Sequence, residues 1–427
     1  MLQILDANKD KEKIKAILAR SQIDLKEISL RVDEIIEEVR LDGDKALLKF
    51  THLYDKNKIR DLKVREDEIK RAKENIDKDL KGAILNAIEN IKKYHKKQIR
   101  EGYEIREGDD IVSGQIINPI EEVGIYVPGG TASYPSTVMM NVIPAKLAGV
   151  KRIVITTPAD QDGNIKDSVL VAADLLGVKE IYKVGGAQAI SALAYGSETI
   201  KRVDKIVGPG NIYVATAKHK LSGLVGIDMV AGPSEVVIIG DKDANPSFIG
   251  ADLIAQAEHD KRAASIVLTD SRDLAERIKE ELSKQLKGLS RSHIASFSLE
   301  KYGAIILCQT KKECFDLANK LAPEHLEILT KDPFNDYKMV KNAGAIFLGE
   351  YSPEPLGDYY AGPNHTLPTS RTARFSSGLS VDDFTKKTSL LYYSKSVLEK
   401  VGEDIILLAE DEGLTGHANS IKIRMGK

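Results

Sequence analysis

The sequence predicts an α/β protein with two Rossmann-like units of parallel sheet, a helical N-terminal region and a small C-terminal extension. From Val123 onward, short β-branched runs alternate with helix-like stretches, and glycine lies at many of the junctions. The alternation pauses near Gly232-Pro233-Ser234 and then resumes, which indicates a second unit. We therefore expect a helical region over 1–122, a first unit over 123–234, a second over 235–377 and an extension over 378–427.

The N-terminal region is polar and shows no clear strand pattern. Apolar residues recur at intervals of three and four at Ile69, Ala72, Ile76, Leu80, Ile84, Ile88 and Ile91. This spacing predicts one long amphipathic helix between Arg65 and Arg100. We expect part of the region to pack on the second unit.

Three glycine-rich turns follow predicted strands of the first unit, at 124–127, 180–184 and 205–207, and precede predicted helices. Such turns expose backbone N–H groups at the carboxyl ends of parallel strands, where phosphate-bearing cofactors bind. Each glycine can also simply close a tight turn, and no turn matches G-x-G-x-x-G. The turns are Val127-Pro128-Gly129-Gly130, Val184-Gly185-Gly186-Ala187-Gln188 and Val207-Gly208-Pro209-Gly210-Asn211.

The second unit shows the same strand–helix rhythm, with strands expected at 235–239, 264–268, 304–307, 327–329 and 345–348. Residues 351–385 are rich in Pro, Gly, Ser, Thr and Tyr and are expected to form loops. A last helix over 397–410 is predicted to lead to a short terminal strand over 420–424.

Composition excludes several classes of protein. The chain has 427 residues, with 62 Lys and Arg against 64 Asp and Glu, so no basic excess favours a nucleic-acid partner. The two cysteines, Cys308 and Cys314, are too few for a disulfide framework or a cysteine-rich zinc site. No segment approaches the ~20 apolar residues of a membrane helix, and residues 1–20 lack a signal-peptide core. We expect a cytoplasmic protein with no membrane or nucleic-acid partner.

Two short polar motifs flank predicted elements of the second unit. Gln256 and His259 are three residues apart at a helix end, so they share one face and can bind a metal or simply form a polar surface. Glu324 and His325 follow Pro323, which should keep Ala322 extended. Adjacent Glu and His in a βα-type loop before a strand are candidates for proton transfer, although a surface turn would have the same pattern.

Further candidate ligands lie nearer the C-terminus. Asp358 is a hard ligand type and His365 a base or hydrogen-bond donor, in a loop dense in polar side chains. Glu412 and His417 again pair a carboxylate with an imidazole, though each could belong to a solvated segment. Nitrogen and oxygen ligands without thiolate suit one borderline-hard divalent ion, and the candidate set is Gln256, His259, Asp358 and His417.

Taken together, these motifs resemble the histidinol dehydrogenase family over nearly the whole chain. The resemblance rests on Ile125-Tyr126-Val127-Pro128-Gly129-Gly130, Val184-Gly185-Gly186-Ala187-Gln188-Ala189-Ile190, Gly208-Pro209-Gly210-Asn211, Ile227-Asp228-Met229, Ala231-Gly232-Pro233-Ser234-Glu235, Gln256-Ala257-Glu258-His259, Pro323-Glu324-His325-Leu326, Gly357-Asp358-Tyr359, Asn364-His365 and 414–419.

The resemblance implies a role for each of these residues. The expected NAD contacts are Tyr126, Gln188 and Asn211. One zinc ion per subunit is expected on Gln256, His259, Asp358 and His417. Glu324 and His325 match the catalytic acid–base pair. The implied substrate contacts are Ser234, Gln256, His259, His325, Asp358, His365, Glu412 and His417. The family also implies a homodimer in which Glu412 and His417 reach the partner subunit.

The implied activity is the last step of histidine biosynthesis: two successive NAD-dependent oxidations that convert L-histidinol to L-histidinaldehyde and then to L-histidine. A neutral imidazole can take the alcohol proton near pH 7, so His325 is the expected base and Glu324 the expected water activator. A zinc-dependent hydrolase on the same metal site is the alternative enzyme, but it would not need the residues expected to bind NAD. A metabolite sensor would not need Glu324 and His325. Both cysteines lie away from these motifs, which argues against a covalent thiohemiacetal.

Overall fold

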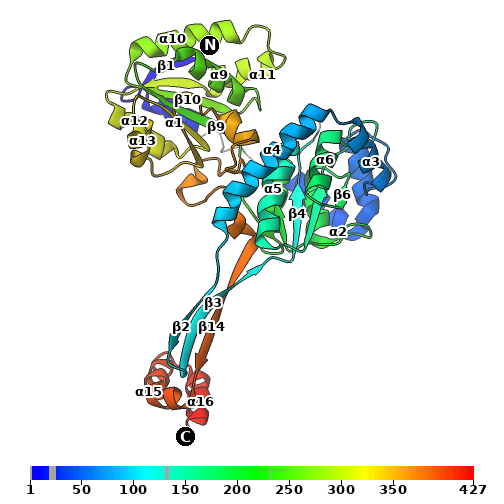
Figure 1. The fold of residues 1–427 in the computed structure, drawn as a ribbon, viewed down its shortest axis with the longest axis vertical. Coiled ribbons are helices and arrows are strands. Elements are labelled where there is room, and N and C mark those ends of the chain that lie inside the picture. Colours follow the sequence, from blue (N-terminus) through cyan, green and yellow to red (C-terminus); the bar gives the residue numbers. More distant parts are fainter. Residues whose placement is uncertain (1, 19–25, 130–133, 231) are drawn as a thin grey trace.

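Two parallel sheets form the body of the molecule, and a narrow arm projects from it (Figure 1). The computed structural model describes residues 2–18, 26–129, 134–230 and 232–427. Gly130 and Ala231, which belong to motifs of the sequence, lie outside the described residues. The fold class is the predicted one, α/β with two parallel-sheet units.

The first sheet has the strand order β6-β5-β4-β7-β8, and all its strands are parallel. The chain runs outward from β4 in one direction and then returns to β7 on the other side, so the order reverses between β4 and β7. Ligands of open α/β sheets bind beside such a reversal. The elements are β4 (Glu122–Tyr126), α5 (Pro135–Ala148), β5 (Arg152–Thr156), α6 (Asp167–Leu175), β6 (Glu180–Tyr182), α7 (Gly186–Tyr195), β7 (Lys205–Val207), α8 (Ile212–Leu221) and β8 (Gly226–Ile227).

The second sheet repeats this order, with β9 in the place of β4, and adds the N-terminal strand β1 at one edge. Its order is β1-β11-β10-β9-β12-β13, again all parallel. The elements are β1 (Gln3–Asp6), β9 (Glu235–Gly240), α9 (Pro246–Ala257), β10 (Ala264–Thr269), α10 (Arg272–Gln285), α11 (Ser292–Tyr302), β11 (Ala304–Leu307), α12 (Lys311–Leu321), β12 (His325–Leu329), α13 (Pro333–Asp336) and β13 (Ala345–Leu348).

The central strand β9 shows why these apolar runs form a doubly covered sheet. All six of its residues are buried. Val236 and Ile238 pack into one hydrophobic core, whereas Val237 and Ile239 pack into the core on the opposite face. Successive side chains of a strand point to opposite faces, so a strand with helices on both sides must be apolar throughout.

The N-terminal region divides between the two units. β1 and α1 (Lys11–Leu18) belong to the second unit. The other three helices cover the first unit, with α2 (Lys26–Tyr54) on α7 and α8, α3 (Glu66–Asn75) on α6, and α4 (Lys78–His95) on α5. The single long helix predicted over 65–100 is wrong, because the chain turns extended at Ile76 and the Asp77 side chain caps a new helix. The expectation of a strand-free region is also wrong, since β1, β2 and β3 lie within it.

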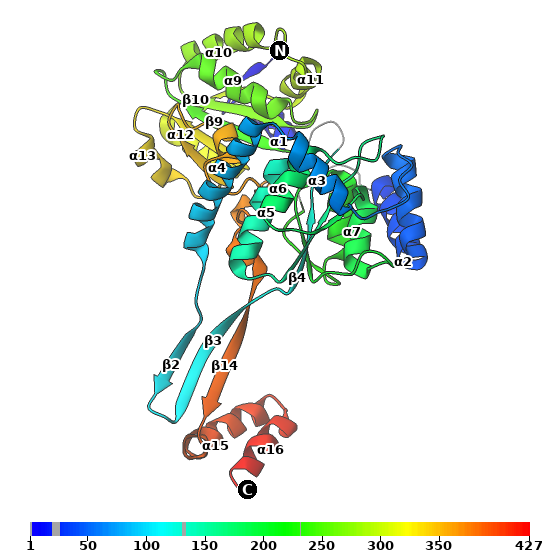
Figure 2. The same cartoon turned by 45° about the vertical axis from the view of Figure 1, so that its right-hand side comes forward.

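The arm is an antiparallel sheet of order β14-β3-β2 that ends in two helices. It comprises β2 (Tyr103–Glu107), β3 (Ile111–Pro119), β14 (Thr385–Tyr393), α15 (Lys395–Asp411) and α16 (Thr415–Arg424). Both views place α15, α16 and the C-terminus at the end of the arm, away from the two sheets (Figures 1 and 2). The terminal strand predicted over 420–424 is wrong: this stretch is helical because Ala418 and Ile421 pack against Ile406 and Ala409 of α15.

The stretch expected to be loop, 351–385, contains one short helix and two 3-10 turns. They are α14 (Glu354–Tyr359), η4 (Thr372–Arg374) and η5 (Val381–Phe384). Further 3-10 turns are η2 (Lys96–Gln98) and η3 (Tyr337–Met339). Across the described part of the chain, no helix combines the length and apolar content that crossing a membrane requires.

Candidate active site

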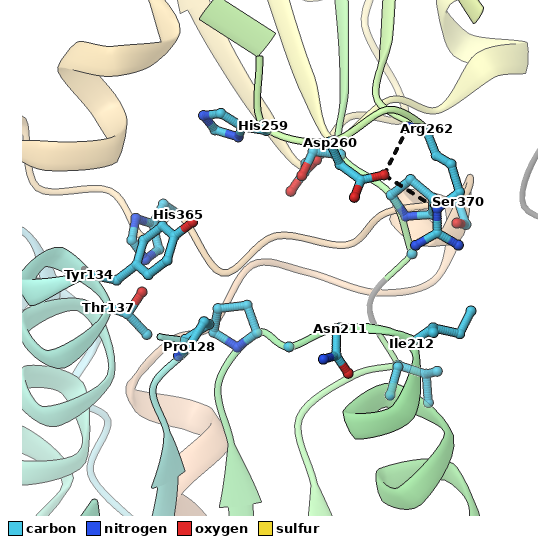
Figure 3. Close-up of a pocket in the computed structure, with 18 of the residues that line it drawn as sticks. Pro128, Tyr134, Thr137, Asn211, Ile212, His259, Asp260, Arg262, His365 and Ser370 are labelled. Carbon is cyan, nitrogen blue, oxygen red and sulfur yellow. Dashed lines mark hydrogen bonds and ion pairs between the residues drawn. The ribbon is translucent and has the colours of Figure 1, made fainter. Parts of the chain in front are cut away.

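A cavity of about 1030 Å³ lies between the two units and is lined by both. Figure 3 shows Pro128 and Asn211 on one side and His259 on the opposite side. The first unit contributes the carboxyl ends of its strands, since Pro128 follows β4 and Asn211 follows β7. The second unit contributes the amino ends, since Ser234 precedes β9 and His325 begins β12. The two sheets therefore meet at the cavity with opposite edges.

The wall from the first unit is built mainly from backbone turns. Gly208 follows β7 with a φ of +110°, and a Cβ there would lie 2.2 Å from the carbonyl oxygen of Tyr126. Only glycine fits that turn without displacing β4. Asn211 then caps α8, because its side-chain oxygen accepts from the backbone N–H groups of Tyr213 and Val214. The amino end of α8 is thus held at the cavity wall.

The other two predicted NAD contacts lie beneath this wall. Tyr126 is buried, its hydroxyl accepts from the Gly186 N–H at 3.1 Å, and burial raises its pKa to about 12. Gln188 is also buried, and neither atom of its side-chain amide meets a hydrogen-bond partner among the described residues. Asn211 lines the cavity, whereas Tyr126 and Gln188 do not. Their role as NAD contacts stays a prediction.

His325 provides a buried, neutral imidazole at the opposite wall. Its Nδ1 lies 3.2 Å from the backbone carbonyl oxygen of Glu235, which can only accept, so Nδ1 carries the proton. Nε2 keeps its lone pair, lies 3.9 Å from Asp358 Oδ1 and has no hydrogen-bond partner among the described residues. Burial lowers the pKa of His325 to about 3, although the bond to Glu235 opposes the shift. The ring is therefore a proton acceptor at neutral pH.

Glu324 is fixed beside His325 by the backbone. One carboxylate oxygen accepts from the Glu235 N–H at 3.0 Å, and the same oxygen lies 3.7 Å from His325 Nδ1. The extended backbone predicted for Ala322 is wrong: this residue is left-handed, with φ 48° and ψ 60°, because it caps the end of α12. The predicted βα-type loop is also wrong, since Glu324 and His325 lie where a helix leads into a strand.

Three potential metal ligands meet near His325. Ligand atoms of His259, Glu354 and Asp358 all lie within 4.8 Å of one another. Burial raises the pKa of Asp358 to about 7, and burial together with the Asp358 charge raises that of Glu354 well above its usual range. His259 lines the cavity and is exposed to solvent there, yet desolvation by the surrounding protein lowers its pKa. Buried carboxylates this close together are costly unless they are protonated or neutralised by a cation.

Gln256 is completely buried behind this group. The amide orientation that gives both ends a suitable neighbour places its nitrogen 3.1 and 3.2 Å from the two carboxylate oxygens of Glu354, which accept its hydrogen bonds. The same nitrogen lies 3.2 Å from His325 Nδ1, but Nδ1 donates to the Glu235 carbonyl oxygen and so takes no hydrogen bond from the amide. That arrangement leaves the carbonyl oxygen of Gln256 as its available ligand atom. The backbone of Glu354 is held against β12, because the Glu327 side chain of that strand accepts from the Glu354 N–H at 2.9 Å.

His365 lines the cavity beside Asp358. Its Nδ1 donates to the Asp358 carbonyl oxygen at 3.0 Å, and burial lowers its pKa to about 4. Asn364, which precedes His365, anchors the loop. Its side-chain Nδ2 donates to the Met140 carbonyl oxygen at 2.5 Å and lies 3.4 Å from His95 Nε2. His95 falls outside the predicted site. Because it lies in a predicted helix among charged residues, the sequence predicts a solvated side chain. It is instead fully buried.

Glu412 and His417 are not brought to the cavity by this chain. Both are exposed and lie at the end of the arm, Glu412 after α15 and His417 in α16. Figures 1 and 2 place these helices well away from both sheets. Of the predicted site, the chain itself gathers Ser234, His259, Glu324, His325, Asp358 and His365 around the cavity, with Gln256 directly behind.

Sequence reasoning missed Glu354 and the pair Asp260 and Arg262. Glu354 and Asp358 are four residues apart in α14, so a helical reading of that stretch would have placed both carboxylates on one face. Arg262 lines the cavity and donates to Asp260, with its backbone N–H 2.8 Å and its Nε 3.3 Å from Oδ1 (Figure 3). No pattern in the sequence distinguishes that pair from a surface ion pair.

These features define a class of two-unit α/β protein in which the carboxyl edge of one sheet faces, across a cavity, the candidate acid–base pair and a group of nitrogen and oxygen side chains that could hold a metal ion. Comparison with known proteins agrees with this class. The family model described as histidinol dehydrogenase matches residues 18–425. The histidinol dehydrogenase of Caldanaerobacter subterraneus subsp. tengcongensis is 54% identical over 408 residues, covering 95% of this chain and 94% of that protein. That of Clostridium acetobutylicum is 53% identical over 422 residues, covering 99% and 98%.

A solved structure extends the similarity to the fold. The crystal structure of histidinol dehydrogenase from Elizabethkingia anophelis superposes with a TM-score of 0.93 at 39% identity, covering 100% of this chain and 98% of that one. The chain belongs to the histidinol dehydrogenase family, as the sequence motifs predicted. A betaine aldehyde dehydrogenase from Staphylococcus aureus, at 13% identity and a TM-score of 0.50, shares the fold alone, covering 92% and 91% of the two chains.

Proposed function

We propose that this protein oxidises L-histidinol to L-histidine in two NAD-dependent steps through L-histidinaldehyde, which is the last step of histidine biosynthesis. The observation that carries the proposal is His325, a buried and neutral imidazole whose Nε2 has no hydrogen-bond partner among the described residues. His325 lines the same cavity as the residues that follow β4 and β7 of the first unit, where we expect NAD to bind. Family membership supports the substrate.

His325 acts as the base in the first oxidation. Its Nε2 accepts the alcohol proton, and NAD, when bound, would supply the acceptor for the hydride of the adjacent carbon. Because Nδ1 is fixed on the Glu235 carbonyl, the ring keeps one orientation and one tautomer through the step. The oxidised product is the aldehyde.

Glu324 acts in the second oxidation. Its carboxylate orients and deprotonates the water that adds to the aldehyde, and His325 again takes a proton as the second hydride leaves. The Glu235 N–H holds one oxygen of Glu324 at 3.0 Å, which fixes the carboxylate beside His325.

One zinc ion per subunit fits the donor set of nitrogen and oxygen atoms. Gln256, His259 and Asp358 would hold it, together with the partner's His417, and Glu354 would orient Gln256. When bound, zinc supplies a Lewis acid that anchors the substrate. The raised pKa of Asp358 supports this reading, because a cation offsets the cost of burying a charged carboxylate.

The substrate is held by side chains of both walls and, we propose, of both subunits. Ser234, His365 and the zinc ligands would position it from one chain. A homodimer would bring Glu412 and His417 of the arm to the partner's cavity. The arm supports this arrangement because Leu391, Leu407, Leu408 and Ile423 on it are 72, 65, 68 and 65% exposed. Apolar surface of this kind is typical of a face that another subunit covers. The cytoplasm is the expected location.

The proposal is tested by counting NADH by absorbance after L-histidinol and NAD are added to zinc-loaded protein. Two NADH per histidinol, lost on chelation and restored by zinc, are expected. One NADH per histidinol would mean that the aldehyde escapes and that Glu324 lacks the proposed role. No NADH from folded, zinc-loaded protein would overturn the activity and favour a hydrolase or a metabolite-binding protein on the same site.

A further inference from the structure

A buried ion pair lies behind the first wall of the cavity and takes no part in the proposed chemistry. Lys218 of α8 and Asp228, directly after β8, are in contact, and their side chains are only 2% and 1% exposed. Asp228 belongs to the Ile227-Asp228-Met229 motif, to which sequence reasoning assigned no role. Two charges buried this deeply lose their hydration, and their attraction alone seldom compensates for that loss.

Both members of the pair bind the same residue. The Lys218 ammonium donates to the Gly208 carbonyl oxygen at 2.9 Å, and Asp228 Oδ2 accepts from the Gly208 N–H at 2.8 Å. The pair thus satisfies both the backbone N–H and the backbone carbonyl of Gly208, the residue whose φ is +110° and which leaves no room for a Cβ beside the Tyr126 carbonyl. Hydrogen bonds to charged groups are among the strongest available to a backbone.

Gly208 opens the turn that lines the cavity. Pro209, Gly210 and Asn211 follow it directly, all three face the cavity, and α8 begins after Asn211. Because Lys218 lies in α8 itself, the pair links the body of the helix to the start of the turn that leads into it. Displacement of Gly208 would therefore shift the backbone against which a dinucleotide would bind.

We infer that Lys218 and Asp228 are positioning residues that hold the turn 208–211 in the geometry that binds NAD. The inference rests on the proposed function, in that it takes this edge of the first sheet to be the NAD site. The pair touches neither substrate nor the acid–base groups, so it should affect NAD affinity and leave the chemical step largely unchanged.

The test is the double variant K218M/D228N. It removes both charges together, so no unpaired charge is buried, and the new amide can still accept from the Gly208 N–H while the contact to the Gly208 carbonyl is lost. We expect the Kd and KM for NAD to rise about tenfold. The kcat at saturating NAD and the KM for histidinol should stay within about twofold. Should this variant not fold, K218Q/D228N, which also removes both charges but keeps polar side chains next to the N–H and carbonyl of Gly208, should show the same split with a smaller rise.

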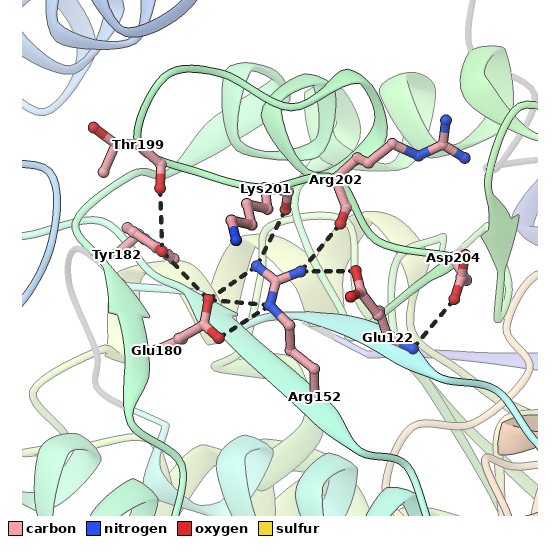
Figure 4. A network of polar contacts seen from close by, with 8 residues as sticks. All are labelled: Glu122, Arg152, Glu180, Tyr182, Thr199, Lys201, Arg202 and Asp204. Carbon is pink, nitrogen blue, oxygen red and sulfur yellow. Dashed lines mark hydrogen bonds and ion pairs between the residues drawn. The ribbon is translucent and has the colours of Figure 1, made fainter.

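A matched control lies at the other edge of the same sheet. Arg152 binds Glu180 and Glu122, each at 2.9 Å, and also the carbonyl oxygens of Lys201 and Arg202 (Figure 4). Glu122, Arg152 and Glu180 begin β4, β5 and β6, and Lys201 and Arg202 precede β7, so the whole group lies at the amino ends of these strands, and none of it lines the cavity. The control variant R152M/E180Q also removes an ion pair from the first unit, that between Arg152 and Glu180. It should lower thermal stability without changing NAD affinity.

A selective rise in the Kd for NAD in K218M/D228N, absent from R152M/E180Q, supports the inference. An unchanged Kd in folded K218M/D228N, or an equal rise in both variants, would overturn it, because the pair would then act only on stability. Failure of the unaltered protein to bind NAD would overturn the proposed function together with this inference.

Discussion

The two walls of the cavity come from sheets of the same strand order but use opposite edges. The first unit presents carboxyl ends, where a glycine-rich turn and the amino end of α8 line the cavity. The second presents amino ends, where Glu324 and His325 are fixed on the backbone of Glu235. The comparison shows that one fold can supply two kinds of wall. Backbone dipoles at a carboxyl edge suit a phosphate-bearing ligand, and side chains at an amino edge suit acid–base chemistry.

The amino edge can hold reactive side chains because the neighbouring strand orients them. The backbone N–H of Glu235 binds Glu324 and its carbonyl binds His325, so the first residue of β9 fixes both. The Glu235 side chain in turn accepts from the Ser370 N–H at 2.6 Å, which attaches the loop after His365 to the same point. The usual placement of ligands at carboxyl ends therefore describes only half of this cavity.

The largest expected effect is in the second wall. His325→Asn removes the base and should lower kcat by about 10²- to 10⁴-fold. Steady-state NADH formation at saturating histidinol and NAD measures this loss. Near-normal turnover would assign the base to another group.

Glu324→Gln should separate the two oxidations. An amide cannot deprotonate water, so the second step should slow by about 10²-fold or more. The first oxidation should be less affected, and NADH per histidinol should fall from two toward one. Trapping the released product with an aldehyde reagent provides the measurement. Two NADH per histidinol in this variant would mean that Glu324 does not activate water.

The metal ligands should show a graded effect. Asp358→Asn should weaken zinc binding by about 100-fold or more, whereas Glu354→Gln, which acts through Gln256, should weaken it by about 10- to 100-fold. Competition with a chromogenic chelator gives both affinities without any need for turnover. An effect of Glu354→Gln that equals or exceeds that of Asp358→Asn would make Glu354 a direct ligand.

The smallest expected effect lies outside both walls, under the loop that carries His365. Burial lowers the pKa of His95, and the bond to Gln98 only partly opposes the shift. Below the unfolded value of about 6.5 the unfolded chain therefore binds the extra proton, and the free energy of unfolding falls as pH falls. The difference between this protein and its His95→Gln variant should change with pH by less than about 1.4 kcal/mol per pH unit. Urea unfolding at pH 7.5 and pH 5.5 measures it, and a difference that stays constant with pH would contradict a buried neutral His95.

The sequence was sufficient to predict the strands of both units except β1 and β8, because their apolar runs and flanking glycines are local signals. It could not show which edge of each sheet faces the cavity, since that depends on how the two units pack. The helix end at Ala322 illustrates the limit. Proline at 323 disfavours a helical residue before it, but capping of α12 places Ala322 in the left-handed region instead of the extended one.

The family resemblance supplied the site residues of the sequence analysis, and their roles stay predictions, although several of them line one cavity. Residues that reach the cavity only through contacts between elements were missed. Glu354 joins the ligands only because the stretch after Pro353 forms α14 and because Glu327 binds its N–H. The arm was missed for the same reason: its strands β3 and β14 are far apart in the chain, and their pairing follows from tertiary structure. Lys218 and Asp228 are ordinary charged residues in the sequence, and only their burial on Gly208 gives them a role.

The division of work between the walls is tested most directly by measuring NAD affinity and the single-turnover rate of hydride transfer on two variants, one for each wall. Asn211→Ala should raise the Kd for NAD about tenfold and leave the rate at saturating NAD within about threefold. His325→Asn should do the reverse, with an NAD affinity close to that of the unaltered protein and a rate lowered by at least about 10²-fold. Loss of both properties in both variants would contradict the account, because the two walls would then act as one site.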